Sequence, residues 1–65
     1  MPSSVIRTFH YEPDQRRLNV VFVGGRRYAY HSVPARLASA MKQALSKGEF
    51  FNAHIRDHFR FTRES

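Results

Sequence analysis

Apolar and polar residues alternate with the period of β-strands in the first half of the chain. Residues 5–11 are rich in β-branched and aromatic side chains and end at a Pro-Asp turn signal, which predicts a first strand. Its apolar residues share one face only if a β-bulge lies between Ile6 and Phe9. A second strand is predicted over residues 17–23, and a third follows the pair Gly24-Gly25. Three consecutive strands joined by short turns predict an antiparallel meander.

The turn at the glycine pair decides which side chains share a face of this sheet. A two-residue turn would pair Val21 with Tyr28 and place the aromatic residues of the third strand opposite the large apolar residues of the second. A three-residue loop with Gly25 in the left-handed conformation pairs Val20 with Tyr28 and Leu18 with Tyr30 instead. Only this second register gathers the large apolar groups on one face, so we predict it.

The period changes to that of helices in the second half of the chain. Pro34 suits the first turn of a helix, where its missing N–H is harmless. Apolar residues then recur at helical spacing from Leu37 to Ala44 or Leu45, and a glycine stop follows at residues 46–48. These signals predict the first helix.

A second helix is predicted to begin at Glu49. Phe51, Ile55 and Phe59 lie at i, i+4 and i+8 and form a narrow apolar stripe, and the helix is expected to fray after Phe61. The expected fold is therefore of the α+β class, a three-stranded antiparallel β-meander with two C-terminal α-helices packed on one face. A chain of 65 residues is expected to form one domain over residues 1–65.

The composition narrows the class of protein. The absence of cysteine excludes a disulfide framework and a thiolate zinc site. No stretch approaches the roughly 18 apolar residues of a membrane-spanning helix, and the first four residues lack the features of a signal peptide. We therefore expect a cytoplasmic protein without a membrane partner, and the sequence leaves its oligomeric state open.

The charge points to a polyanionic partner. Eleven basic and five acidic side chains give a formal net charge of +6, and nine of the eleven basic residues are Arg. The planar guanidinium meets phosphate with two hydrogen bonds and stacks on bases, whereas Lys acts more as a point charge. Nucleic acid is the partner that this composition favours.

An ordered set of short motifs runs through nearly the whole chain. Its members are Ser3-Ser4, Ile6, Tyr11, Leu18-x-Val20-x-Phe22, Gly25, Tyr28-x-Tyr30, Val33-Pro34 and Ser46-x-Gly48-x-Phe50-Phe51-Asn52-x-x-Ile55-Arg56. This set resembles the KTSC domain, a family named for the C-terminus of certain lysyl-tRNA synthetases and marked by a Tyr-x-Tyr motif. The resemblance implies an RNA-binding role through the synthetase context, and it supplies no catalytic residues.

Arginines are the candidate nucleic-acid contacts. The meander places the start of the first strand near the hairpin of the second and third, so Arg7, Arg26 and Arg27 are expected at one end of the sheet. If the second helix persists, Arg56, Arg60 and Arg63 follow i, i+4 and i+7 and form a basic stripe. A groove that joins the two surfaces is an open alternative.

Other side chains are candidates for narrower roles. Tyr28 and Tyr30 are possible aromatic contacts for bases, but in the preferred register they face the core. His54 and His58 lie one helical turn apart, a spacing that can present two imidazoles to a metal ion. Two ligands are too few for a metal site. Asn52 could contact a ligand, although a hydrogen bond that ties the second helix to the preceding loop is the favoured interpretation.

The sequence predicts a small binding module without catalytic residues, metal or cofactor. No nucleophile elbow, paired acids or phosphate-cradling glycine loop is present. The predicted function is binding of RNA through arginine-phosphate contacts with little sequence readout. The alternative is a protein-protein interaction or self-association module that uses Val21, Val23 and Ala29 on the outer face of the sheet.

Overall fold

The computed structural model describes residues 6–64 of the chain. Val5, the predicted start of the first strand, and the Ser3-Ser4 pair lie outside the described residues. The elements in chain order are β1 (Ile6–Glu12), β2 (Arg17–Phe22), β3 (Arg27–Tyr30), α1 (Ala35–Gln43), α2 (Lys47–Phe50), the π-helical turn η1 (Phe51–Ile55) and β4 (Phe61–Arg63).

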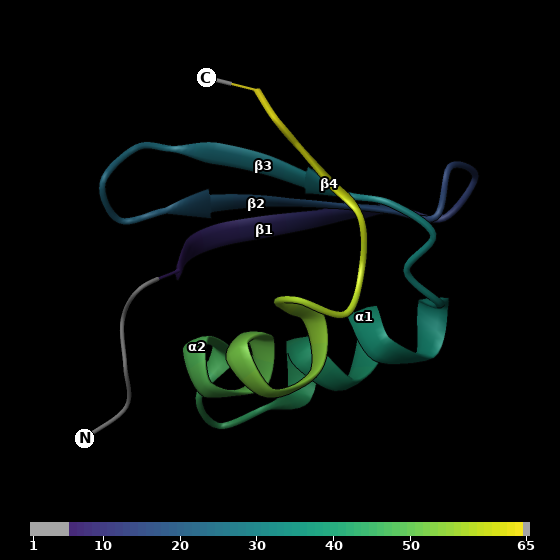
Figure 1. Cartoon of the computed structure of the whole chain (residues 1–65). Helices are drawn as coiled ribbons and strands as arrows, with labels where there is room; N and C mark the ends of the chain where they lie inside the picture. The colour runs from purple at the N-terminus through teal and green to yellow at the C-terminus, as the bar shows by residue number, and fades with distance from the viewer. Residues whose placement is uncertain (1–5, 65) are drawn as a thin grey trace.

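The strands form one antiparallel sheet in the order β1-β2-β3-β4, and the helices cover one of its faces (Figure 1). The predicted α+β class and the meander of the first three strands are confirmed. The strand count is higher than predicted, because β4, at the end of the chain, pairs with the open edge of β3.

The register of the β2-β3 hairpin is the predicted one. Leu18 pairs with Tyr30 and Val20 with Tyr28, and Gly25 has a φ of +92°. The N–H of Gly25 donates to the carbonyl oxygen of Phe22 at 2.8 Å, which closes the three-residue loop. Glycine adopts this left-handed conformation without steric penalty. The large apolar side chains of the hairpin consequently share the face that the helices cover.

The predicted bulge in the first strand is also present. Ile6 pairs with Phe22 but Thr8 pairs with Val21, so the register shifts by one residue between Ile6 and Thr8. Arg7 is the extra residue. The shift lets Ile6 and Phe9 point to the same face although they are three positions apart, a spacing that places two residues of a regular strand on opposite faces.

The core lies between the sheet and the helices. Its buried members come from β2, β3, the β3-α1 connection, α1 and η1, and are Leu18, Val20, Tyr30, Val33, Met41, Phe51 and Ile55. Phe51 stands at the centre, with its ring centroid 5.4 Å from that of Phe22 and 5.2 Å from that of Tyr30 in edge-to-face contacts.

The first helix is shorter than predicted. α1 ends at Gln43, and Ala44 is extended with φ −68° and ψ 143°. Leu45 is fully exposed rather than part of an apolar stripe. The cause is the next N-cap: the Ser46 hydroxyl accepts a hydrogen bond from the Glu49 N–H at 3.2 Å, and this cap requires extended backbone before α2.

The second helical segment also ends earlier than predicted. The N–H of Arg56 donates to the carbonyl oxygen of Phe51 at 2.8 Å, which closes the π-helical turn. Arg56 is extended with ψ 133°, and Asp57 has φ +66°, a left-handed conformation that Asp tolerates better than most residues. A longer helix would leave the edge of β3 unpaired, whereas the turn at Asp57 sends the chain back to the sheet as β4.

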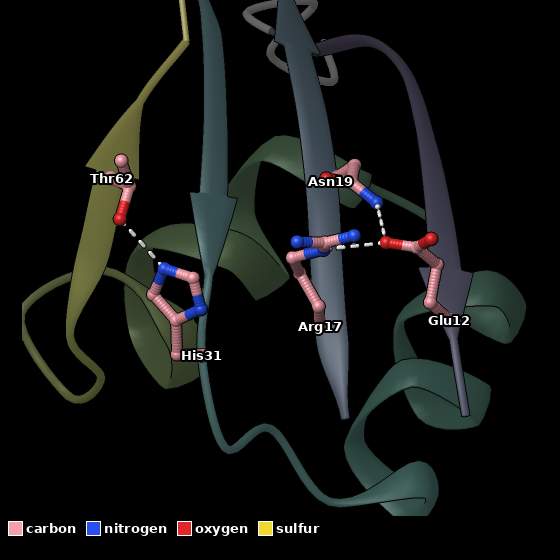
Figure 2. A network of polar contacts seen from close by, with 5 residues as sticks. All are labelled: Glu12, Arg17, Asn19, His31 and Thr62. Carbon is pink, nitrogen blue, oxygen red and sulfur yellow. Dashed lines mark hydrogen bonds and ion pairs between the residues drawn. The ribbon is translucent and has the colours of Figure 1, made fainter. Parts of the chain in front are cut away.

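The outer face of the sheet carries polar side chains from β1, β2 and β4 and from His31, which directly follows β3 (Figure 2). The Glu12 Oε1 accepts from Arg17 Nε at 2.6 Å and from Asn19 Nδ2 at 2.9 Å, and His31 Nε2 lies 2.7 Å from Thr62 Oγ1. This arrangement stabilises the pairing of neighbouring strands on the side that faces away from the helices.

The prediction that Val21, Val23 and Ala29 form an apolar patch on the outer face of the sheet is wrong. Ala29 lies on this face but is completely buried between its cross-strand neighbours Asn19 and Thr62. Val23 follows β2 in the hairpin loop and lines a cleft on the helix side, and Val21 is half-buried. The three residues therefore do not form a continuous exposed surface.

The Glu12 carboxylate gives a first testable prediction. Hydrogen bonds from Arg17 and Asn19 lower the pKa of Glu12 from 4.5 to about 2. Because the folded-state pKa is the lower one, the interaction stabilises the fold above pH 4.5 and this stabilisation is lost as the pH falls toward 2. Arg17→Gln should move the NMR titration midpoint of Glu12 upward, toward 4.5.

The matched control is Arg36→Gln, which removes an exposed cation on α1. It should leave the Glu12 midpoint unchanged. An equal midpoint in the wild type and in Arg17→Gln would show that the ion pair does not set the acidity of Glu12.

Candidate nucleic-acid interface

An open cleft of about 570 Å³ lies between the end of the β2-β3 hairpin and the C-terminal end of η1. This volume is within the roughly 300–1,000 Å³ of typical small-molecule sites. The residues that line it come from β2, the hairpin loop, β3, η1, the turn after η1 and β4, and are Phe22, Val23, Gly24, Arg26, Tyr28, Tyr30, Phe51, Asn52, Arg56, Asp57 and Phe61.

Aromatic rings make up much of the lining of this cleft. The Phe61 ring on β4 lies 5.3 Å from the ring of Tyr28 and 5.5 Å from that of Tyr30, measured between centroids. Tyr30 is buried, Tyr28 is half-buried and Phe61 is 53% exposed. The rings of the Tyr-x-Tyr pair therefore pack against Phe61, which is the most exposed of the three residues.

The buried position of Tyr30 affects the pKa of its hydroxyl group. Burial raises the pKa of Tyr30 above its ordinary value of 10, and the nearby Tyr28 adds to the rise. The charges of Arg56 and Asp57 act on the same hydroxyl in opposite directions. Tyr30 is consequently a neutral core residue that borders the charged rim of the cleft.

Two arginines reach the cleft from different elements. Arg26 comes from the hairpin, and Arg56 comes from the residue that ends η1. Within residues 6–64 neither guanidinium forms an ion pair or a side-chain hydrogen bond. Asp57 adds one carboxylate to the same lining, so the cleft has an excess of positive charge.

The other predicted arginines are distributed over the sheet. Arg27 pairs with Val21 and falls on the outer face, whereas Arg63 pairs with Tyr28 and falls on the cleft face. Arg7 lies at the β1 bulge, at the same end of the sheet as the hairpin. Arg60 precedes β4, and its carbonyl oxygen accepts from the His31 N–H at 2.8 Å.

The helical stripe predicted for Arg56, Arg60 and Arg63 is therefore wrong. The helix ends at Ile55, and the three arginines lie at its end, before β4 and within β4. Arg56 and Arg26 line one cleft instead. This arrangement agrees with the alternative left open by the sequence, a groove that joins the hairpin end of the sheet to the second helical segment.

Three residues of the cleft were missed or misread in the sequence. Phe61 and Asp57 were placed in the second helix, although the alternation of Phe61, Thr62 and Arg63 is compatible with a short strand. Asn52 makes no side-chain hydrogen bond within the described part of the chain, and Ser46 caps the helix instead. Asn52 is exposed and lines the cleft.

Residues 6–64 contain neither a cluster of metal ligands nor a membrane-spanning helix. No group of three or more His, Cys, Asp or Glu side chains is placed to hold a metal ion there, and the His54 ring packs on Phe50 with centroids 4.5 Å apart. Over the same residues, no helix has the length and apolarity to cross a membrane.

Comparison with known proteins places the chain in a family. The KTSC domain profile matches residues 2–59, which include the Tyr-x-Tyr pair and η1 and end before β4. The chain belongs to the KTSC domain family. The solved structure of a KTSC domain protein from Yersinia pestis is similar to it, with a TM-score of 0.87 and 34% identity over all of this chain and 94% of that one.

The relatives include both small proteins and parts of a large enzyme. An uncharacterised protein of Stutzerimonas stutzeri is 36% identical over 64 residues, which cover 97% of this chain and 90% of that protein. A lysine–tRNA ligase of Nostoc punctiforme is 37% identical over 62 residues, 95% of this chain. The chain spans only 11% of the length of that ligase. Sequences similar to this chain thus occur both as small proteins and as a short segment of a lysine–tRNA ligase.

Proposed function

We propose that this KTSC protein binds RNA through arginine contacts with phosphate. The observation that carries the proposal is the convergence of Arg26 and Arg56 on one open cleft, where neither has an ion-pair partner within residues 6–64. A guanidinium pair of this kind accepts a phosphate without first breaking an internal ion pair.

The charge and the relatives support RNA as the partner. A formal net charge of +6 on 65 residues attracts a polyanion from all directions. The similar segment in the lysine–tRNA ligase belongs to a protein whose substrate is an RNA, which favours RNA over DNA. Binding through phosphate implies little dependence on base sequence.

Binding is a better account of the cleft than catalysis. Its charged and amide side chains are Arg26, Arg56, Asp57 and Asn52, and among the described residues that line it there is no Ser, Thr, Cys, Lys or His. Acyl or phosphoryl transfer requires an activated nucleophile or a paired acid and base. The two arginines and the exposed aromatic ring of the lining favour recognition, and they support a binding role.

A salt titration tests this function. The affinity for a labelled single-stranded RNA, measured by fluorescence anisotropy, should fall about sevenfold or more between roughly 50 and 200 mM salt, because two neutralised phosphates give a slope near −1.4. A hairpin RNA of the same length serves as a second ligand. Absence of binding to both RNAs at the lower salt would contradict the proposal and favour a protein partner.

A further inference from the structure

The cleft combines an exposed aromatic ring, two guanidinium groups and one carboxylate within one lining. We propose that it binds one unstacked nucleotide of a single strand, with the base on Phe61, the phosphates on Arg26 and Arg56, and an amino group of the base on Asp57. This inference rests on the RNA binding proposed above, and it adds a defined site for one base.

Phe61 provides the stacking surface. Its ring is 53% exposed, and the rings of Tyr28 and Tyr30 pack against it at tilts of 41° and 37°. The tyrosines hold Phe61 in place from the core side, so little side-chain entropy is lost when a base covers its other side. Proteins commonly bind the unstacked bases of single-stranded nucleic acid by stacking them on an exposed aromatic ring of this kind.

The charges favour a strand over a free nucleotide. Arg26 and Arg56 reach the cleft from different elements, the hairpin and the end of η1, and two separate guanidinium groups can meet successive phosphates of one strand. Arg63 falls on the same face of the sheet, opposite Tyr28, and adds positive potential along the path of the chain. A single nucleotide carries one phosphate group and can bind only some of these arginine side chains.

Asp57 gives the site a preference among bases. Its carboxylate lines the cleft, is exposed, and is held by a left-handed backbone with φ +66°. An ionised carboxylate only accepts hydrogen bonds, so it pairs with the amino group of cytosine and is opposed by the carbonyl oxygen at the same position of uracil. The site should therefore prefer cytosine to uracil, two bases of the same size.

The test compares two short single strands that differ by one cytosine or uracil within an otherwise identical sequence. The wild type should bind the cytosine strand more tightly, and Asp57→Asn should bring the ratio of the two affinities close to one. The ratio is the readout because this variant also raises the net charge, which acts on both strands alike. Asn tolerates the left-handed backbone, so the fold should persist.

Stacking is tested separately. Phe61→Leu should weaken binding of the cytosine strand by about 5- to 150-fold, the usual effect of removing one base–aromatic stack. Phe61→Tyr, which keeps the ring, should bind as the wild type does. Phe9→Leu is the control, since Phe9 is a half-buried aromatic residue outside the cleft and should leave affinity unchanged.

The outcomes separate this inference from the proposed function. Absence of binding to either strand at low salt contradicts RNA binding itself. Salt-dependent binding that is equal for both strands and insensitive to Phe61→Leu leaves RNA binding intact and overturns the base site. Cytidine monophosphate that binds as tightly as the strand would overturn the assignment to a strand and make the cleft a site for free nucleotides.

Discussion

Replacement of Phe51 by alanine is expected to remove a large part of the free energy of unfolding. Phe51 is 2% exposed, and its ring contacts Phe22 on β2 and Tyr30 on β3. Truncation of a buried Phe costs about 3–5 kcal/mol, and a domain of this size has a free energy of unfolding of about 3–10 kcal/mol. Urea denaturation followed by far-UV circular dichroism should show a transition midpoint shifted to much lower urea.

Leu45→Ala is the control for this prediction. Leu45 is fully exposed between α1 and α2, although the sequence pattern placed it on the apolar stripe of the first helix. Its truncation should change the free energy of unfolding by less than about 0.5 kcal/mol. Similar losses for the two variants would mean that the helix stripe, and not the packing of η1 on the sheet, forms the core.

The hairpin could be predicted from the sequence because its signals are local. The glycine at residue 25 and the alternation on both sides of it admit only one register that puts the large apolar residues together. The same argument located the bulge before Phe9. In both cases the pattern of neighbouring residues decides the geometry, and the structure confirms it.

The end of the chain could not be predicted in this way. Phe59 continues the helical period of Phe51 and Ile55, so local pattern favours a longer helix. The competing interactions are distant in sequence: the backbone of β4 pairs with β3, and the Phe61 ring packs on Tyr28 and Tyr30. Tertiary contacts of this kind override local helix propensity.

The candidate site was predictable only in part for the same reason. The predicted meander places exposed arginines near the hairpin, and Arg26 could be predicted in this way. The cleft depends on where η1 stops, and the residues that stop it, Arg56 and Asp57, carried no recognised stop signal. The cleft that brings the hairpin and the helix end together therefore emerges only in the folded chain.

Loss of both cleft arginines is the second large effect that we expect. Arg26→Ala combined with Arg56→Ala should weaken binding of single-stranded RNA by about tenfold or more at roughly 50 mM salt, because two charge-assisted hydrogen-bonding groups are removed. Both side chains are exposed, so the fold should be preserved. Urea denaturation of the double variant verifies that it is.

The matched control removes the same charge elsewhere. Arg36→Ala combined with Lys42→Ala takes two exposed cations from α1, outside the cleft, and leaves the same net charge as the cleft variant. If RNA binds by general attraction to a basic protein, the two double variants lose affinity equally. If the RNA binds in the cleft, only the variant that lacks Arg26 and Arg56 loses phosphate contacts.

The salt dependence of RNA affinity in these two double variants tests the central claim most directly. We expect the slope of log affinity against log salt to become shallower by about 1.4 in the cleft variant, as two lost phosphate contacts require, and to stay close to that of the wild type in the α1 variant. Equal slopes in the two variants would contradict a phosphate-binding site between the hairpin and the end of η1.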